Sequence, residues 1–222
     1  MSVETALVTL LTADATTAAL IGTHGMSDGD AVTLLTSAAD LPDPLAIGTT
    51  YYVRDAAATT FKLTATVGGG AVDITDAGTG THRCIPTARP REWFTFTAAA
   101  SDTCTCTRYR IYPGVAPQGS LVPCLVYNRI SAPRFRSLDG PEGYATPRIQ
   151  LDAWAGSYSE AKALAVAVRE AIDGYTGVSG VWEIGDMDCD DEGDALFVSE
   201  ELDARRRYGV RQDWIVWHVE TP

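Results

Sequence analysis

Apolar and polar positions follow a helical period at the start of the chain. Residues 2–22 place Leu7 and Leu11 on one apolar stripe, the spacing of a helix that packs on a core. Asp14 lies within this segment, where its side chain is suited to cap a second turn, and Gly22 is suited to end it. The pattern therefore predicts a helical N-terminal segment.

A second helical pattern, between residues 157 and 174, is the clearest in the chain. Ser157 and Glu160 have the spacing of a capping box, and apolar residues recur at intervals of three and four as far as Ile172. Gly174 supplies a stop. These signals predict one well-defined helix.

Elsewhere the pattern has the period of two that is typical of strands. Cys104 and Cys106 lie two apart in a Thr-rich stretch, so we expect both thiols on one face of a strand. The closing strand carries apolar bulk on both faces, with Trp214 and Trp217 on opposite sides, which favours a central position in a sheet or cover by a neighbouring subunit. The predicted strands span residues 31–35, 50–54, 60–64, 93–97, 121–130, 148–153, 181–184, 195–199 and 211–219.

Composition changes near residue 24 and again near residue 108. The segment between them is rich in Thr, Gly and Ala, and turn residues such as those at 27–30 and 41–44 separate its short strand-like runs. Short strands at this spacing indicate a small all-β module.

The formal net charge of −12 is spread along the chain. Such a protein has no broad basic face to neutralise phosphates, so tight binding of duplex DNA is not expected. No apolar run approaches the ~20 residues of a membrane helix, and the N-terminus lacks a basic segment followed by an apolar one. We expect neither a membrane protein nor a secreted one.

Candidate chemistry is sparse. The five cysteines are an odd number in a chain large enough to fold without disulfides, so reduced thiols are expected. The three histidines are scattered, and no set of residues has zinc-ligand spacing. The acidic run 186–194 fails as an EF-hand, because Asp191 stands where Gly is needed and Phe197 where a bidentate Glu is needed. We predict a solvated acidic loop there, and no metal, cofactor or catalytic residue.

Four runs of residues resemble, in the right order, the phage tail-completion (tail-terminator) protein family. They are residues 110–119 (RIYPGVAPQG), 138–140 (LDG), 148–161 (RIQLDAWAGSYSEA) and 211–218 (RQDWIVWH). The resemblance implies an α+β fold with a mixed or antiparallel sheet and two packed helices. In that family the leading helix continues almost directly into the RIYPG segment, whereas here residues 24–107 intervene.

The interruption predicts two domains. Residues 1–23 and 108–222 would form the tail-completion domain, and residues 24–107 an inserted all-β domain at a surface turn. The insert is itself similar to a β module that recurs in phage virion proteins, through segments such as 45–53 and 76–82. Its motif order suggests circular permutation, in which case its first and last strands would pair.

The family resemblance also implies a function. Such proteins form a homo-hexameric ring at the head-proximal end of the tail tube of a siphovirus, end tube polymerisation and join the tail to the head-tail connector (adaptor) protein. Genome DNA passes through the lumen without specific binding. The expected location is the tail or neck of the virion, with assembly in the host cytoplasm, and no enzymatic activity is implied.

A ring requires heterologous contacts between subunits. The candidate interface residues lie in the loop 131–147, in an arginine run and in the closing strand, although each group also has an ordinary structural interpretation as exposed loop, solvated turn or core. An alternative function is virion decoration or glycan binding by the insert, with Tyr51, Tyr52 and Trp93 as a stacking surface. The interface candidates are Arg134, Arg136, Arg205, Arg206, Arg207, Trp214 and Trp217.

Overall fold

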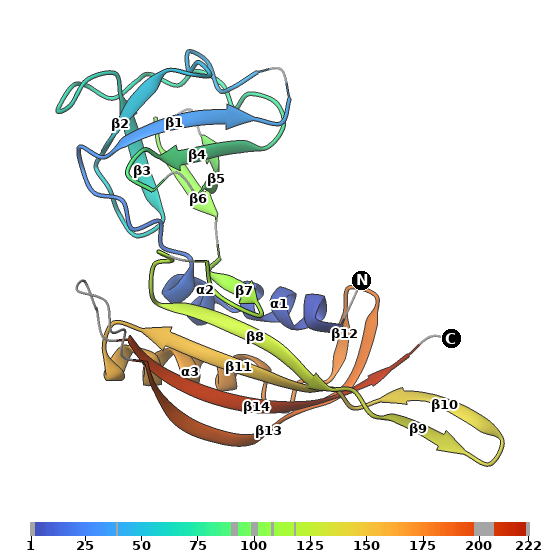
Figure 1. The fold of residues 1–222 in the computed structure, drawn as a ribbon. Helices are drawn as coiled ribbons and strands as arrows, with labels where there is room; N and C mark the ends of the chain where they lie inside the picture. The colour runs from blue at the N-terminus through green and yellow to red at the C-terminus, as the bar shows by residue number, and fades with distance from the viewer. Residues whose placement is uncertain are drawn as a thin grey trace. The chain divides into compact units, whose positions relative to one another are not determined.

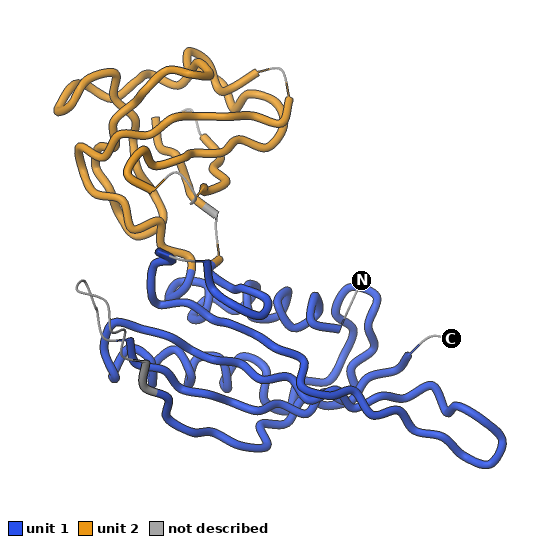
Figure 2. The backbone as a smooth tube through the Cα atoms, in the orientation of Figure 1, with its two compact units in different colours: residues 1–21, 110–222 blue, residues 22–109 orange. Residues whose placement is uncertain are grey.

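A computed structural model of the protein describes residues 3–38, 40–89, 93–98, 102–107, 109–117, 119–197 and 207–220 (Figure 1). The chain divides into two compact units, drawn in blue and orange in Figure 2. Unit 1 contains Met1–Ile21 and Arg110–Pro222, and unit 2 contains Gly22–Tyr109. The boundaries expected from the sequence lie close to these, and independent folding of each unit stays a prediction.

Unit 1 begins with two short helices, α1 (Val3–Ala13) and α2 (Ala15–Ile21). Asp14 separates them and caps the second, because its Oδ1 accepts a hydrogen bond from the N–H of Thr17 at 2.7 Å. No single helix among the described residues is long and apolar enough to cross a membrane; α1 and α2 meet that test only together, and they are bent by 92° at the break.

The third helix, α3 (Tyr158–Ile172), has the caps that its sequence predicts. The N–H of Glu160 donates to the hydroxyl of Ser157, which is the N-cap residue. Gly174 follows the helix with a φ of +68°, a left-handed conformation that glycine adopts without strain. Its N–H donates to the carbonyl of Met187, which ties the end of the helix to the neighbouring strand.

The sheet of unit 1 has eight strands and is antiparallel except for one pair. Along its main path the strand order is β12-β13-β14-β11-β8-β7, with β7 parallel to β8, and the β9–β10 hairpin pairs with β14 through β10. Its strands are β7 (Ile111–Pro113), β8 (Cys124–Ser131), β9 (Arg134–Ser137), β10 (Gly140–Ala145), β11 (Arg148–Ala155), β12 (Gly177–Ser179), β13 (Trp182–Phe197) and β14 (Arg207–Val219).

The expected α+β fold with two packed helices is confirmed only in part. The mixed sheet is present, but the protein is mostly β, with 45% strand, and its described residues form three helices rather than two. The difference has local causes: Asp14 divides the leading helix, and two segments expected as loops form strands instead.

The core of unit 1 lies between the helices and one face of the sheet. Leu7, Leu11 and Ile21 pack with the buried residues of α3 and with the helix-facing side chains of β11 and β14. Strand β14 is central, since β11 and β13 pair with it on either side, which confirms the position predicted for the closing strand.

Unit 2 is a closed six-stranded barrel in the order β1-β2-β3-β6-β5-β4. Its core is built from alternate inward residues, including Cys104 and Cys106 on one face of β6 as predicted. All of its regular elements among the described residues are strands: β1 (Ala31–Thr36), β2 (Thr50–Arg54), β3 (Thr60–Thr64), β4 (His82–Pro86), β5 (Phe94–Ala98) and β6 (Cys104–Thr107).

The expectation that the first and last strands of the insert pair with each other is wrong. Strand β1 pairs with β2 and β4, whereas β6 pairs with β3 and β5. Both ends of the insert instead bind one turn, because His24 N–H donates to the carbonyl of Ala58 at 3.1 Å and Cys106 N–H donates to that of Thr59 at 2.7 Å. The turn before β3 thus holds the two ends of unit 2 near each other.

In unit 1 the corresponding chain ends meet directly. The N–H of Arg110 donates to the carbonyl of Ile21 at 3.1 Å, and its guanidinium donates to the carbonyls of Leu20 at 3.2 Å and Pro123 at 2.7 Å. This buried arginine therefore satisfies carbonyls at the C-terminus of α2, where a positive charge also interacts favourably with the helix dipole.

Candidate assembly surface

The segment 131–147, expected to be a loop, is a β hairpin that extends from the sheet of unit 1 (Figure 1). All four residues of β9 are exposed, among them Arg134, Phe135 and Arg136. Leu138 at the hairpin turn has a relative exposure of 107%, and Tyr144 on β10 is 51% exposed. An arm with this much exposed apolar surface is typical of a binding site.

The two tryptophans of β14 have different environments. Trp214 is fully buried among the core residues of unit 1. Trp217 lies on the opposite face of the strand, is 45% exposed and stacks on Phe135 of the hairpin, with ring centroids 5.3 Å apart. The exposed surface of Trp217 is therefore accessible to a binding partner, whereas Trp214 is part of the hydrophobic core.

Arg134 and Arg136 differ in their contacts within the chain. Arg134 makes a two-pronged ion pair with Glu220, at 2.6 Å from Nε and 2.8 Å from Nη2. The hydrogen bond from Arg134 lowers the pKa of Glu220. Arg136 has no ion pair with any described residue, so its charge remains available at the surface.

The arginine run is only partly described. Arg205 and Arg206 lie outside the described residues. Arg207 begins β14, is half-buried and donates from Nη2 to the carbonyl of Ser120 at 3.0 Å. Its side chain therefore has a structural contact within unit 1.

The acidic run 186–194, predicted to be a solvated loop, lies within the long strand β13. Its carboxylates are nevertheless exposed at Asp186, Asp188, Asp190 and Asp191. Asp190 lies 4.0 Å from Arg148, and the other three have no ion pair with any described residue. The run is a strand because β14 pairs alongside it and because Met187 is buried against the helices.

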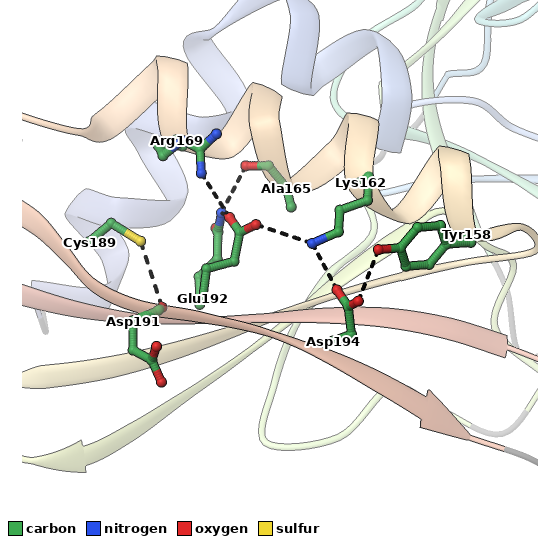
Figure 3. A network of polar contacts seen from close by, with 9 residues as sticks. Tyr158, Lys162, Ala165, Arg169, Cys189, Asp191, Glu192 and Asp194 are labelled. Carbon is green, nitrogen blue, oxygen red and sulfur yellow. Dashed lines mark hydrogen bonds and ion pairs between the residues drawn. The ribbon is translucent and has the colours of Figure 1, made fainter.

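The helix-facing side chains of β13 form a polar network with α3 (Figure 3). Glu192 accepts hydrogen bonds from Gln212 at 2.9 Å, Arg169 at 3.0 Å and Lys162 at 3.3 Å. Lys162 also pairs with Asp194 at 2.7 Å. The Gln212 contact is the main cause of the lowered pKa of Glu192, and the two cations lower it further.

In unit 2, the aromatic surface considered for glycan binding does not form as expected. Tyr51 is buried, and its hydroxyl accepts a hydrogen bond from the N–H of Ala46 at 3.0 Å. Trp93 is exposed, but the Arg83 guanidinium lies over its ring, 4.4 Å from the centroid. An open cavity of about 610 Å³ lies elsewhere on the barrel and is lined by Asp40, Leu41, Asp43, Leu45, Ala46, Ile47, Asp76, Ala77, Gly78 and Thr79.

The histidines and cysteines have structural environments. His24 accepts a hydrogen bond from Met26 N–H, His82 lies 2.9 Å from the Ala77 carbonyl, and His218 packs edge-on against Trp182. All five cysteines are free, and burial raises the pKa of Cys104 and of Cys106 to about 12. Within the described part of the chain, no group of three or more His, Cys, Asp or Glu side chains is placed to hold a metal ion.

Comparison with known proteins confirms the resemblance seen in the sequence. The model of the family described as tail completion protein gp17 matches residues 96–199, which begin in β5 of unit 2 and end just after β13. The match includes the hairpin, α3 and the acidic strand, and it leaves α1, α2 and β14 outside. The chain is therefore a structural protein of a phage tail, located in the tail or neck of the virion.

Among solved structures, a chain from the virion of a native gene transfer agent particle is similar at 17% identity. The alignment covers 50% of this chain and 79% of that one, with a TM-score of 0.37. No curated protein matches the chain.

Proposed function

We propose that the protein forms a homo-hexameric ring at the head-proximal end of the tail tube, ends tube polymerisation and joins the tail to the head connector. The main support is the family match over residues 96–199, which includes the exposed hairpin arm. In this proposal the protein works by binding to itself, to the tube protein and to the connector, and genome DNA passes through the lumen without specific contacts.

The hairpin is the subunit contact that the geometry favours. Phe135, Leu138, Tyr144 and Trp217 expose apolar surface on and beside the hairpin, and Arg136 adds an exposed charge; aromatic residues and arginine are enriched in protein interfaces. Arg134 stabilises the arm through Glu220. Arg205 and Arg206 stay proposed contacts for the tube or a neighbouring subunit.

Mass photometry of the purified protein tests the ring directly. We expect a species of six times the 23.7 kDa chain mass, and electron microscopy should show rings in solution or one ring at the end of each capped tube. Tubes assembled with the protein should have uniform lengths, whereas tubes without it should keep growing. A protein that stays monomeric at all concentrations and leaves tube growth unchanged would overturn the proposal.

A second candidate function, virion decoration or glycan binding by unit 2, is supported by the open cavity of the barrel. Asp40, Asp43 and Asp76 supply carboxylates around it, and Ile47 adds an exposed apolar side chain. Carboxylates beside apolar surface are suited to hydrogen-bond sugar hydroxyls. Glycan-array binding by the native protein that is lost in an Asp43→Ala variant would favour this function; an array without binding would count against it.

A further inference from the structure

The exposed arm and the exposed acidic strand of unit 1 have complementary chemistry. On β9, Arg134 and Arg136 are exposed and the strand carries no carboxylate, while Asp139 and Glu142 follow at the turn and on β10. On β13, the stretch from Asp186 to Asp191 exposes four carboxylates and carries no cationic residue. Three of these carboxylates have no ion pair among the described residues, so the intramolecular contacts leave their charge largely uncompensated.

These two surfaces lie on opposite sides of β14. Strand β10 of the hairpin pairs with β14 at Tyr144 and Ala145, with β9 beyond it, whereas β13 pairs along the other edge of β14. Past Gly185, β13 has β14 as its one strand partner among the described residues. Each copy therefore presents the arginines of β9 at one edge and an acidic strand at the other.

We propose that the joint between neighbouring copies is formed by the β9–β10 arm of one copy seated on the Asp186–Asp191 stretch of the next. This inference rests on the proposed ring and names the two surfaces that meet in it. The contact is heterologous, because different surfaces of the two copies meet, and repetition of such a joint gives a ring when its rotation closes. Arg136, which has no ion pair among the described residues, pairs with Asp188 of the neighbouring copy, and the exposed Leu138 at the hairpin turn adds apolar contact beside it.

The acidic side chains of β13 are also suited to protect its long edge from indiscriminate pairing with other strands. An uncovered strand edge attracts other strands, and charged side chains are a common protection. Repulsion between acidic edges disfavours contact of two β13 strands, whereas an arm carrying arginine is attracted. Charge complementarity of this kind selects the partner surface and speeds the encounter.

A reciprocal charge exchange tests the joint. In Arg136→Glu the arm becomes acidic, and in Asp188→Arg the acidic strand gains a cation. Each variant alone places like charges together at every joint, and we expect association at least about tenfold weaker than that of the native protein. When the two variants are mixed in equal amounts, alternating copies place opposite charges at every joint, so rings should return.

Mass photometry and sedimentation velocity of the native protein, each variant and the mixture measure the effect. Glu170→Arg, a charge reversal on the exposed face of α3, is the matched control and should leave association unchanged. Melting temperatures near the native value exclude misfolding, and recovery in the mixture shows that both variants are folded.

The outcomes separate this inference from the proposed function. If the native protein forms rings and both variants do so equally well, the joint is wrong and the ring stands. Two weakened variants that do not recover on mixing would also overturn the pairing of these two surfaces. If the native protein forms no ring in solution or on tube ends, the ring and the joint both fail.

Discussion

Replacing Glu192 with Gln should destabilise unit 1 near neutral pH. The change keeps the shape of the side chain and an oxygen that still accepts from Gln212, but it removes the negative charge that binds Arg169 and Lys162. Glu192 is 23% exposed and the two cations are 41% and 34% exposed, so solvent screens both pairs. At roughly 0.5–1 kcal/mol each, the loss is about 1–2 kcal/mol of unfolding free energy.

The effect should depend on pH with a defined sign. Because the pKa of Glu192 is lowered in the folded protein, its contribution is present above the unfolded value of about 4.3 and is lost as the pH falls through the folded value. The native protein and the Glu192→Gln variant should therefore differ near pH 7 and converge in acid. Above the unfolded pKa the difference should be constant.

Urea unfolding followed by tryptophan emission measures this difference, because Trp93 alone of the five tryptophans lies in unit 2. Glu183→Gln is the matched control: it makes the same change on the same strand at an exposed position without an ion pair among the described residues, and should change stability little. A variant as stable as the native protein near pH 7, or a deficit that persists unchanged in strong acid, would refute the reasoning.

Three further predictions concern unit 1. Replacing residues 22–109 with a short Gly/Ser link should leave a soluble, cooperatively unfolding protein, since Ile21 and Arg110 are already hydrogen-bonded, and aggregation of that protein would show that the units share a core. Gly209→Ala should cost about 1–3 kcal/mol in a urea titration, because its Cβ would lie 2.8 Å from the Trp154 ring; an unchanged midpoint would show that the ring moves aside freely. Asp14→Ala should cost about 1 kcal/mol by removing the cap of α2, whereas Asp14→Asn should retain most of the stability.

The ends of the helices could be predicted from the sequence, because the caps that set them are contacts between residues close together in the chain. The caps of α3 at Ser157 and Gly174, and the cap at Asp14, each involve residues within a few positions of one another. The central position of β14 could also be predicted, because a strand with apolar bulk on both faces requires cover on both.

The features that could not be predicted from the sequence depend on contacts between residues far apart in the chain. A run of alternating aspartates has low strand propensity, yet Asp186–Asp191 forms a strand because β14 supplies its hydrogen bonds and Met187 enters the core. Alternation placed Trp214 and Trp217 on opposite faces but did not tell which face the helices cover. The exposed arm contains no periodic apolar pattern, so the sequence predicted a loop where the structure has a hairpin. Its two arginines, Arg134 and Arg136, could nevertheless be predicted to be exposed.

The hydrogen bond between Arg110 and Ile21 joins the two ends of unit 1 that flank unit 2 in the sequence. The carbonyl oxygen of Ile21 and the N–H nitrogen of Arg110 are 3.1 Å apart, so unit 1 is suited to carry a domain whose own termini lie close together. Unit 2 satisfies that condition through the turn at Ala58 and Thr59, which holds both of its ends. The same site is therefore a grafting position, where a reporter or a receptor-binding domain with adjacent termini could be displayed on the virion in place of the barrel.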